Sequence, residues 1–124
     1  MEDRLTAVRL RIERDFAEPR LAFPGVAFRR GAAVDDLVCV SGGHEFAVDG
    51  GRGEEELAVE VADRLQDDAM DQVWTPWPAL ARPDGGVTVL QPRLSPSGIG
   101  VWAADAGYSC PIGTLQAIFG RMLA

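Results

Sequence analysis

The sequence contains no lysine and no asparagine, and all twelve of its basic residues are arginine. Both missing residue types have AT-rich codons, so their absence indicates a GC-rich genome. Nineteen acidic residues outweigh the arginines and give a formal net charge of −7. A chain this acidic lacks the basic surface that nucleic acids and anionic membranes attract. We therefore expect neither nucleic acid nor membrane among its partners.

Long apolar runs are also absent, and none approaches the roughly 20 residues that a membrane-spanning helix needs. The first residues are charged from Glu2 onward, which is not typical of a signal peptide. We therefore expect a cytoplasmic protein, with Cys39 and Cys110 as free thiols in a reducing compartment. Its 124 residues, 47% of them hydrophobic, predict one domain, over residues 1–124, with its own core.

Metal ligands and catalytic motifs are scarce. His44 is the only histidine, and His44-Glu45 begins like a zinc-protease motif, but Val48 stands where the second histidine would be. Cys39, Cys110 and His44 would supply three zinc ligands at most, from distant places. Phosphate-binding loops and nucleophile elbows are missing. We predict no metal, no cofactor and no catalytic residue. Cys110 is the candidate for a reactive thiol, because the N-terminus of a helix predicted just after it would lower its pKa.

The most regular stretch of the chain runs from Gly53 to Pro78. Its apolar residues recur at the spacing of one helical face: Leu57, Ala58, Val61, Ala62, Leu65, Ala69 and Val73. Acidic residues at 54–56 favour a helix N-terminus there. The helix should end at Thr75, because the residue before Pro76 disfavours the α conformation. This stretch predicts a long helix that packs against the core.

The opposite face of that helix carries carboxylates at spacings of three and four residues. We call Glu56, Glu60, Asp63, Asp67 and Asp71 the acidic stripe. Such a stripe is typical of a face that meets only water. Its alternative role is a docking surface for a basic partner. Trp74 and Trp77 follow it, and either they cap the core or they line a groove that takes a peptide or small ligand.

The remaining segments predict mostly antiparallel strands. A helix is favoured over residues 2–17, although Val8, Leu10 and Ile12 also alternate with charged residues as in a strand. Residues 20–30 predict an edge strand or two short extended pieces. Runs at 36–41 and 45–49 form a hairpin, with Cys39 buried in its first strand. Strands follow at 87–91 and 99–104, and Pro111 opens a last short helix. The fold class is α+β, a small antiparallel sheet of about five strands with three helices, in the order α-β-β-β-α-β-β-α.

Three short runs, LQDDAMDQVWTPWP, VWAAD and IGTL, resemble short uncharacterised proteins of GC-rich actinobacteria. The resemblance covers the C-terminal half and implies no known activity. In that group cysteine and histidine often follow the WP, and cysteine follows the later tryptophan. This chain instead reads WPALARPDGG and VWAAD, so the resemblance implies no metal here. The order of elements and the acidity also resemble the small dimeric chaperones of type III secretion, at the level of fold only.

These observations predict a non-enzymatic protein-binding or adaptor module, chaperone-like and homodimeric. Its partner-binding residues would be the acidic stripe together with Trp74 and Trp77. One alternative is a small enzyme or ligand-binding domain with a tryptophan-lined pocket. Another is an acidic antitoxin or immunity-type inhibitor of a basic partner. A deep pocket with converging polar groups would favour the enzyme, and an exposed apolar surface would favour the binding module.

Overall fold

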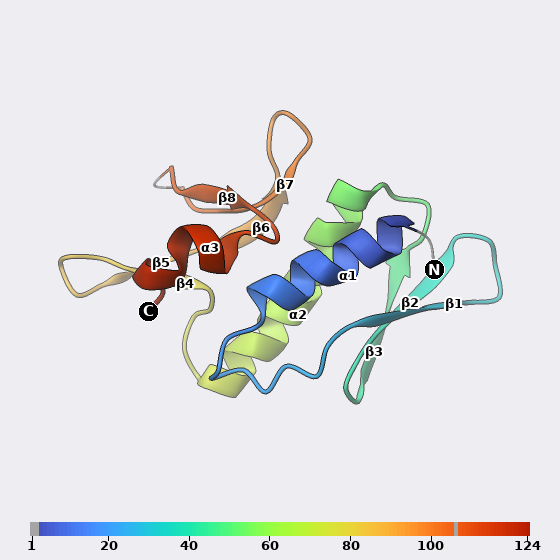
Figure 1. Cartoon of the computed structure of the whole chain (residues 1–124), viewed down its shortest axis with the longest axis horizontal. Coiled ribbons are helices and arrows are strands. Elements are labelled where there is room, and N and C mark those ends of the chain that lie inside the picture. The colour runs from blue at the N-terminus through green and yellow to red at the C-terminus, as the bar shows by residue number, and fades with distance from the viewer. Residues whose placement is uncertain (1–2, 106) are drawn as a thin grey trace.

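A computed structural model of the chain describes residues 3–105 and 107–124 (Figure 1). The described helices are α1 (Asp3–Asp15), α2 (Glu54–Val73), α3 (Leu115–Phe119) and a 3-10 turn η1 (Gly120–Met122). The described strands are β1 (Ala27–Arg30), β2 (Asp36–Ser41), β3 (His44–Asp49), β4 (Ala79–Ala81), β5 (Val87–Val89), β6 (Gln91–Leu94), β7 (Gly100–Ala103) and β8 (Ser109–Pro111). The α+β fold class is thus confirmed.

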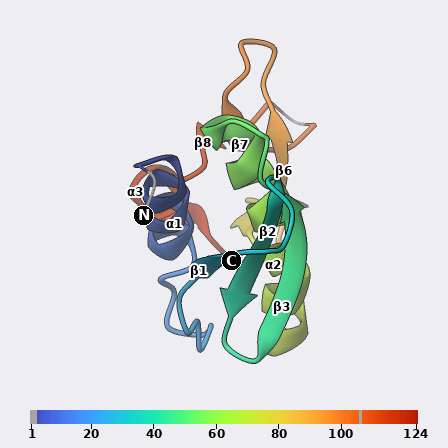
Figure 2. The same ribbon diagram turned by 90° about the vertical axis from the view of Figure 1, so that its right-hand side faces the viewer.

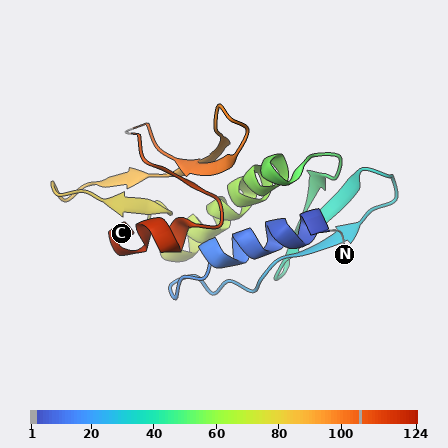
Figure 3. The same ribbon diagram turned by 45° about the horizontal axis from the view of Figure 1, so that its top comes forward.

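Helices α1 and α2 lie side by side across the middle of the molecule (Figures 1 and 3). The predicted N-terminal helix is present, and Leu5, Val8 and Ile12 form its buried face. Glu2, placed at its start by the sequence, lies outside the described residues. The predicted central helix is also present, and it buries six of its seven predicted core residues, from Leu57 to Ala69.

The first sheet has the order β1-β2-β3, and its strands are antiparallel. Ser41 pairs with His44, so the β2–β3 turn is only Gly42 and Gly43, as the hairpin prediction requires. Gly42 has a φ of +60°, a conformation that glycine adopts without strain. His44 opens β3 itself. Figure 2 shows this hairpin in front of α2.

The C-terminal half differs from the expectation of one sheet. Its described strands form a β4-β5 pair and a β6-β7-β8 sheet, so the described chain has eight strands in three small sheets. The strand predicted over 87–91 is interrupted at Leu90. That residue is fully buried and donates its backbone N–H to Pro78 O at 2.9 Å, so the chain leaves one sheet and enters another.

The helix predicted to open at Pro111 begins four residues later, at Leu115. Residues 109–111 instead form β8, where Cys110 pairs with Trp102. Cys110 therefore does not stand at a helix N-terminus, which removes the reason for expecting a reactive thiol there.

The buried core is a single cluster that both halves of the chain share. At its centre the ring of Phe16 lies 4.8 Å from that of Trp77 and 6.1 Å from that of Trp102. Trp77 and Trp102 meet edge to face at 6.0 Å. Their rings fill the space where α1, the exit from α2 and β7 come together.

A partly buried polar network ties α1 to α2 and to the C-terminal half. The guanidinium of Arg11 donates to Glu54 at 2.9 Å and to Glu55 at 2.8 and 2.9 Å, and its Nε donates to Ile112 O at 2.7 Å. Glu55 also accepts the backbone N–H of Gly100 at 2.9 Å. These hydrogen bonds hold the pKa of Glu55 below its usual range.

Among the described residues, no helix is both long and apolar enough to cross a bilayer. Residues 3–105 and 107–124 likewise contain no cluster of three or more histidine, cysteine, aspartate or glutamate side chains suited to hold a metal ion.

Candidate functional site

The acidic stripe lies on the outer face of α2, and four of its five residues are exposed. Glu60 is the exception. It is half-buried, its Oε1 accepts the backbone N–H of Asp49 at 3.3 Å, and it lies 3.5 Å from Nη1 of Arg52. Glu60 therefore fastens the β3–α2 connection, while Glu56, Asp63, Asp67 and Asp71 face solvent.

Arg64 is the one basic residue of α2, and it does not neutralise the stripe. Its guanidinium lies over the ring of Phe46 in β3, 4.6 Å from the centroid. Among the described residues it forms no ion pair with a stripe carboxylate. The exposed part of the stripe therefore keeps its negative charge.

Trp74 and Trp77 lie in opposite environments, although only two residues separate them. Trp74 is 90% exposed, whereas Trp77 is 1% exposed and packs on Phe16 in the core. The two tryptophans therefore do not line a common groove. Trp77 has the core-capping role that was one of its two expected roles, and only Trp74 is available to a partner.

The backbone holds Trp74 in a defined position at the C-terminal cap of α2. It has a φ of +57°, in the left-handed region, and its N–H donates to Met70 O at 2.9 Å. Asp71 precedes Trp74 by three residues, so the exposed indole stands just after the C-terminal end of the helix that carries the stripe.

Both thiols are buried and free. Burial raises the pKa of Cys39 to about 12 and that of Cys110 to about 11. Cys39 lies in the buried hairpin strand, as predicted. The reason for expecting a reactive Cys110 is removed, because α3 begins only at Leu115 and the thiol is buried in the core.

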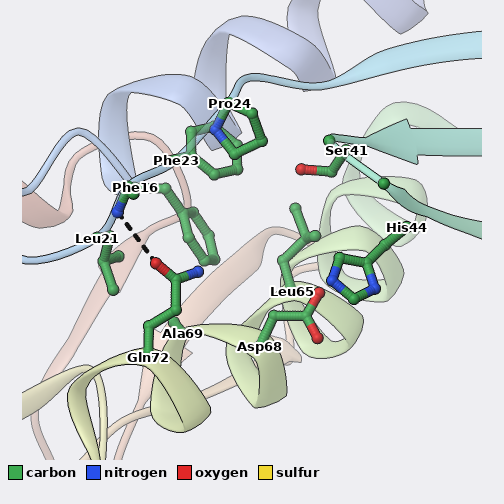
Figure 4. Close-up of a pocket in the computed structure, with 13 residues that line it drawn as sticks. Phe16, Leu21, Phe23, Pro24, Ser41, His44, Leu65, Asp68, Ala69 and Gln72 are labelled. Carbon is green, nitrogen blue, oxygen red and sulfur yellow. Dashed lines mark hydrogen bonds between the residues drawn. The ribbon is translucent and has the colours of Figure 1, made fainter.

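A pocket that sequence reasoning missed opens between α2 and the β2–β3 hairpin. It has a volume of about 190 Å³, and three segments enclose it: residues 16–24, the turn at 41–44, and residues 65–72 of α2 (Figure 4). The backbone N–H of Ala22 donates to Oε1 of Gln72 at 3.0 Å, which fastens the connecting segment to the helix. We call this cavity the hairpin pocket.

Side chains from residues 16–24 and from α2 supply the apolar part of the lining of the hairpin pocket, and the turn at 41–44 supplies polar groups and glycines. The apolar lining side chains are Phe16, Leu21, Ala22, Phe23, Pro24, Leu65 and Ala69. The expected tryptophan-lined pocket is thus replaced by one lined with phenylalanine. The only sequence features that mark this pocket are two phenylalanines near Pro24 and a glycine pair. Neither feature predicts that these segments contact α2.

The polar lining of the hairpin pocket includes a serine, the histidine and an aspartate. The Ser41 hydroxyl donates to Gly25 O at 2.9 Å, so its proton is already engaged. Among the described residues, the side chains of His44 and Asp68 form no hydrogen bond and no ion pair. Nucleophilic catalysis needs a base bonded to the nucleophile and a third group that orients the base. The Ser41 hydroxyl donates to Gly25 O and not to His44, so these three side chains are not hydrogen-bonded in that arrangement in the described structure.

Comparison with protein-family models, curated proteins and solved structures finds no significant match for this chain.

Proposed function

We propose that the protein is a cytoplasmic protein-binding module that docks a basic segment of its partner on the outer face of α2. The single observation that carries this proposal is the position of Trp74. Its indole is 90% exposed and stands at the C-terminal end of α2, three residues after the exposed carboxylate Asp71. We call Asp63, Asp67, Asp71 and Trp74 the docking face.

The chemistry of the docking face favours arginine or lysine in the partner. An exposed indole loses unfavourable contact with water when it is covered. Tryptophan is enriched among the residues that dominate binding energy, and its ring is the best acceptor of a cation–π contact. Carboxylates one helical turn away would pair with the same or neighbouring cations. An overall charge of −7 would also steer a basic partner toward the molecule.

The backbone at Trp74 supports binding without a large ordering cost. The hydrogen bond to Met70 O fixes the cap, and Pro76 and the buried Trp77 anchor the chain that follows. A preorganised anchor loses less conformational entropy when it binds. Free, buried thiols at Cys39 and Cys110 support a reducing compartment. An acidic inhibitor of a basic protein is one form that such a module would take.

A pair of matched peptides tests the proposal. One 12-residue peptide carries arginine and lysine at helical spacing, and the other has glutamine at those positions. We expect only the basic peptide to change the Trp74 fluorescence, with an affinity that falls steeply as salt rises. Trp74→Ala should weaken binding by at least about 10-fold. Asp71→Asn should weaken it too, whereas Asp105→Asn, the same charge change on a distant exposed loop, should not.

Two results would overturn the docking proposal. One is equal binding of the basic and glutamine peptides. The other is Trp74-dependent self-association in sedimentation velocity at the same protein concentration, which would assign the docking face to a second copy of this chain.

A further inference from the structure

We infer that the hairpin pocket is a second binding site, specific for a small primary amine with an apolar body. This inference is independent of the docking face, because the pocket lies where α2 meets the hairpin and the N-terminal connection. Asp68 is the α2 carboxylate that lines it, and Asp68 is not part of the acidic stripe.

The dimensions of the pocket set the size of the ligand. Pockets that enclose drug-sized molecules measure about 300–1,000 Å³. At about 190 Å³, the hairpin pocket is smaller than this and excludes nucleotides and larger cofactors. The side chains of Phe16, Leu21 and Leu65 form an apolar part of its lining, which suits contact with a short alkyl or aromatic group.

The charge of the pocket determines which polar group the ligand should carry beside its apolar body. Asp68 supplies the only formal charge among the described lining residues, because no arginine lines the pocket. Its side chain is half-buried and, among the described residues, unpaired. In Figure 4 its carboxylate points toward the imidazole of His44. Opposite charge is favoured beside a partly desolvated carboxylate, so a cationic ligand is preferred over an anionic one.

The other polar groups narrow the choice to an ammonium. Ser41 already donates to Gly25 O, and the Gln72 Oε1 already accepts from Ala22. The Gln72 amide NH2 remains as a donor, and Asp68 and His44 remain as acceptors, because a carboxylate and an imidazole ring nitrogen without a hydrogen both accept hydrogen bonds. An alkylammonium offers three donors and no acceptor. It therefore satisfies these two residues, while its apolar body contacts the phenylalanine and leucine wall.

The test is a titration followed by ¹H–¹⁵N NMR with three probes of similar size. These are 2-phenylethylamine, the neutral 2-phenylethanol and the anionic 3-phenylpropionate. We expect the amine to bind most tightly and to shift the amides of Ala22, Gly42, Gly43 and Ala69. Asp68→Asn should weaken amine binding by about 10-fold or more, because it removes a charge-assisted hydrogen bond. The same change should leave the weaker binding of the alcohol unaltered.

A substitution elsewhere on α2 is the control. Glu56→Gln also removes one negative charge, on the exposed outer face and outside both the docking face and the pocket, and should leave amine binding within about 2-fold of wild type. Ala69→Leu, with its fold checked by thermal melting, should block the amine and the alcohol alike by filling the cavity. Equal binding of the three probes, or equal effects of Asp68→Asn and Glu56→Gln, would overturn the inference.

A lysine side chain is another source of the same ammonium chemistry. N-acetyl-lysine-methylamide therefore serves as a fourth probe. Binding of this probe through Asp68, without binding of 2-phenylethylamine, would overturn the assignment to a free amine and give the pocket to a partner's side chain.

Discussion

The carboxylate of Asp15, at the end of α1, accepts a hydrogen bond of 2.7 Å from the indole Nε1 of Trp102 in β7. Both residues are fully buried. The same carboxylate accepts the backbone N–H groups of Gly113 at 2.6 Å and Leu115 at 3.0 Å. Leu115 is the first residue of α3, and the Thr114 side chain does not cap that helix. Asp15 thus caps α3 from another part of the chain.

Removal of this carboxylate should strongly destabilise the fold. Asp15→Ala leaves three N–H donors without their partner, and each buried unsatisfied group costs about 1–3 kcal/mol. We expect the free energy of unfolding in urea to fall by about 3 kcal/mol or more. Asp63→Ala, on the exposed face of α2, should change it by no more than about 0.5 kcal/mol. Equal stability of the two variants would contradict the structural role given to Asp15.

The Arg11–Glu55 pair should make part of the stability depend on acid pH. The hydrogen bond from Arg11 lowers the pKa of Glu55 below its ordinary 4.5, and the N–H of Gly100 adds to this effect. The contribution of Glu55 to the free energy of unfolding is therefore fully present above pH 4.5. It is lost as the pH falls through the lowered pKa that Glu55 has in the folded protein. We expect the difference in Tm between wild type and Glu55→Gln to shrink between pH 7 and pH 3. A constant difference would contradict this linkage.

Wild type must be compared with Glu55→Gln because Asp15 changes stability with pH in the opposite direction to Glu55. Burial raises the pKa of Asp15, although its hydrogen bonds act in the other direction. The contribution of Asp15 to the free energy of unfolding is therefore fully present below pH 3.8, its ordinary pKa. It is lost as the pH rises through the raised pKa that Asp15 has in the folded protein. Both wild type and the Glu55 variant contain Asp15, so the difference in Tm removes its effect.

Both thiols should be unreactive in the folded protein. Burial raises the pKa of Cys39 to about 12 and that of Cys110 to about 11, so thiolate is scarce at pH 8. We expect a disulfide reagent to label neither cysteine quickly in buffer and both in denaturant. Rapid labelling of Cys110 alone in buffer would restore the expectation drawn from the sequence.

The left-handed conformation of Trp74 gives a stability test that is separate from binding. Glycine adopts this region with little strain, whereas other residues lose about 1–2 kcal/mol there. Trp74→Gly should therefore be more stable to urea than Trp74→Ala by about 1 kcal/mol. Because the indole is exposed, Trp74→Ala should change the free energy of unfolding by no more than about 0.5 kcal/mol. If alanine proved the more stable of the two, the cap geometry at φ +57° would be wrong.

Local patterns predicted the helices α1 and α2 and the β2–β3 hairpin. Their apolar spacing and the glycine pair act over a few residues, so the signal is contained within each segment. The boundary between β8 and α3 could not be found in this way. Asp15 accepts the N–H groups of Gly113 and Leu115 across about 100 residues, and this contact places the start of the last helix.

Only part of the candidate site could be predicted from the sequence, again because some of its contacts join segments that are distant in the chain. The stripe follows from helical spacing, but the engagement of Glu60 depends on Arg52 and the N–H of Asp49. Trp77 is buried where Gln66 donates to Trp77 O at 3.0 Å and to Leu90 O at 2.7 Å. The sequence shows both tryptophans beside prolines and contains no local signal that separates the buried one from the exposed one.

The partners of Arg11 become available at different times while the chain is being made. Glu54 follows it by 43 residues and Ile112 by 101. At about 5–20 residues per second, the first partner is synthesised about 2–9 s after Arg11 and the last about 5–20 s after it. On the ribosome, α1 can therefore dock on α2 well before the C-terminal strands exist. The part of α1 that later contacts residues 112–115 must remain uncovered during that interval.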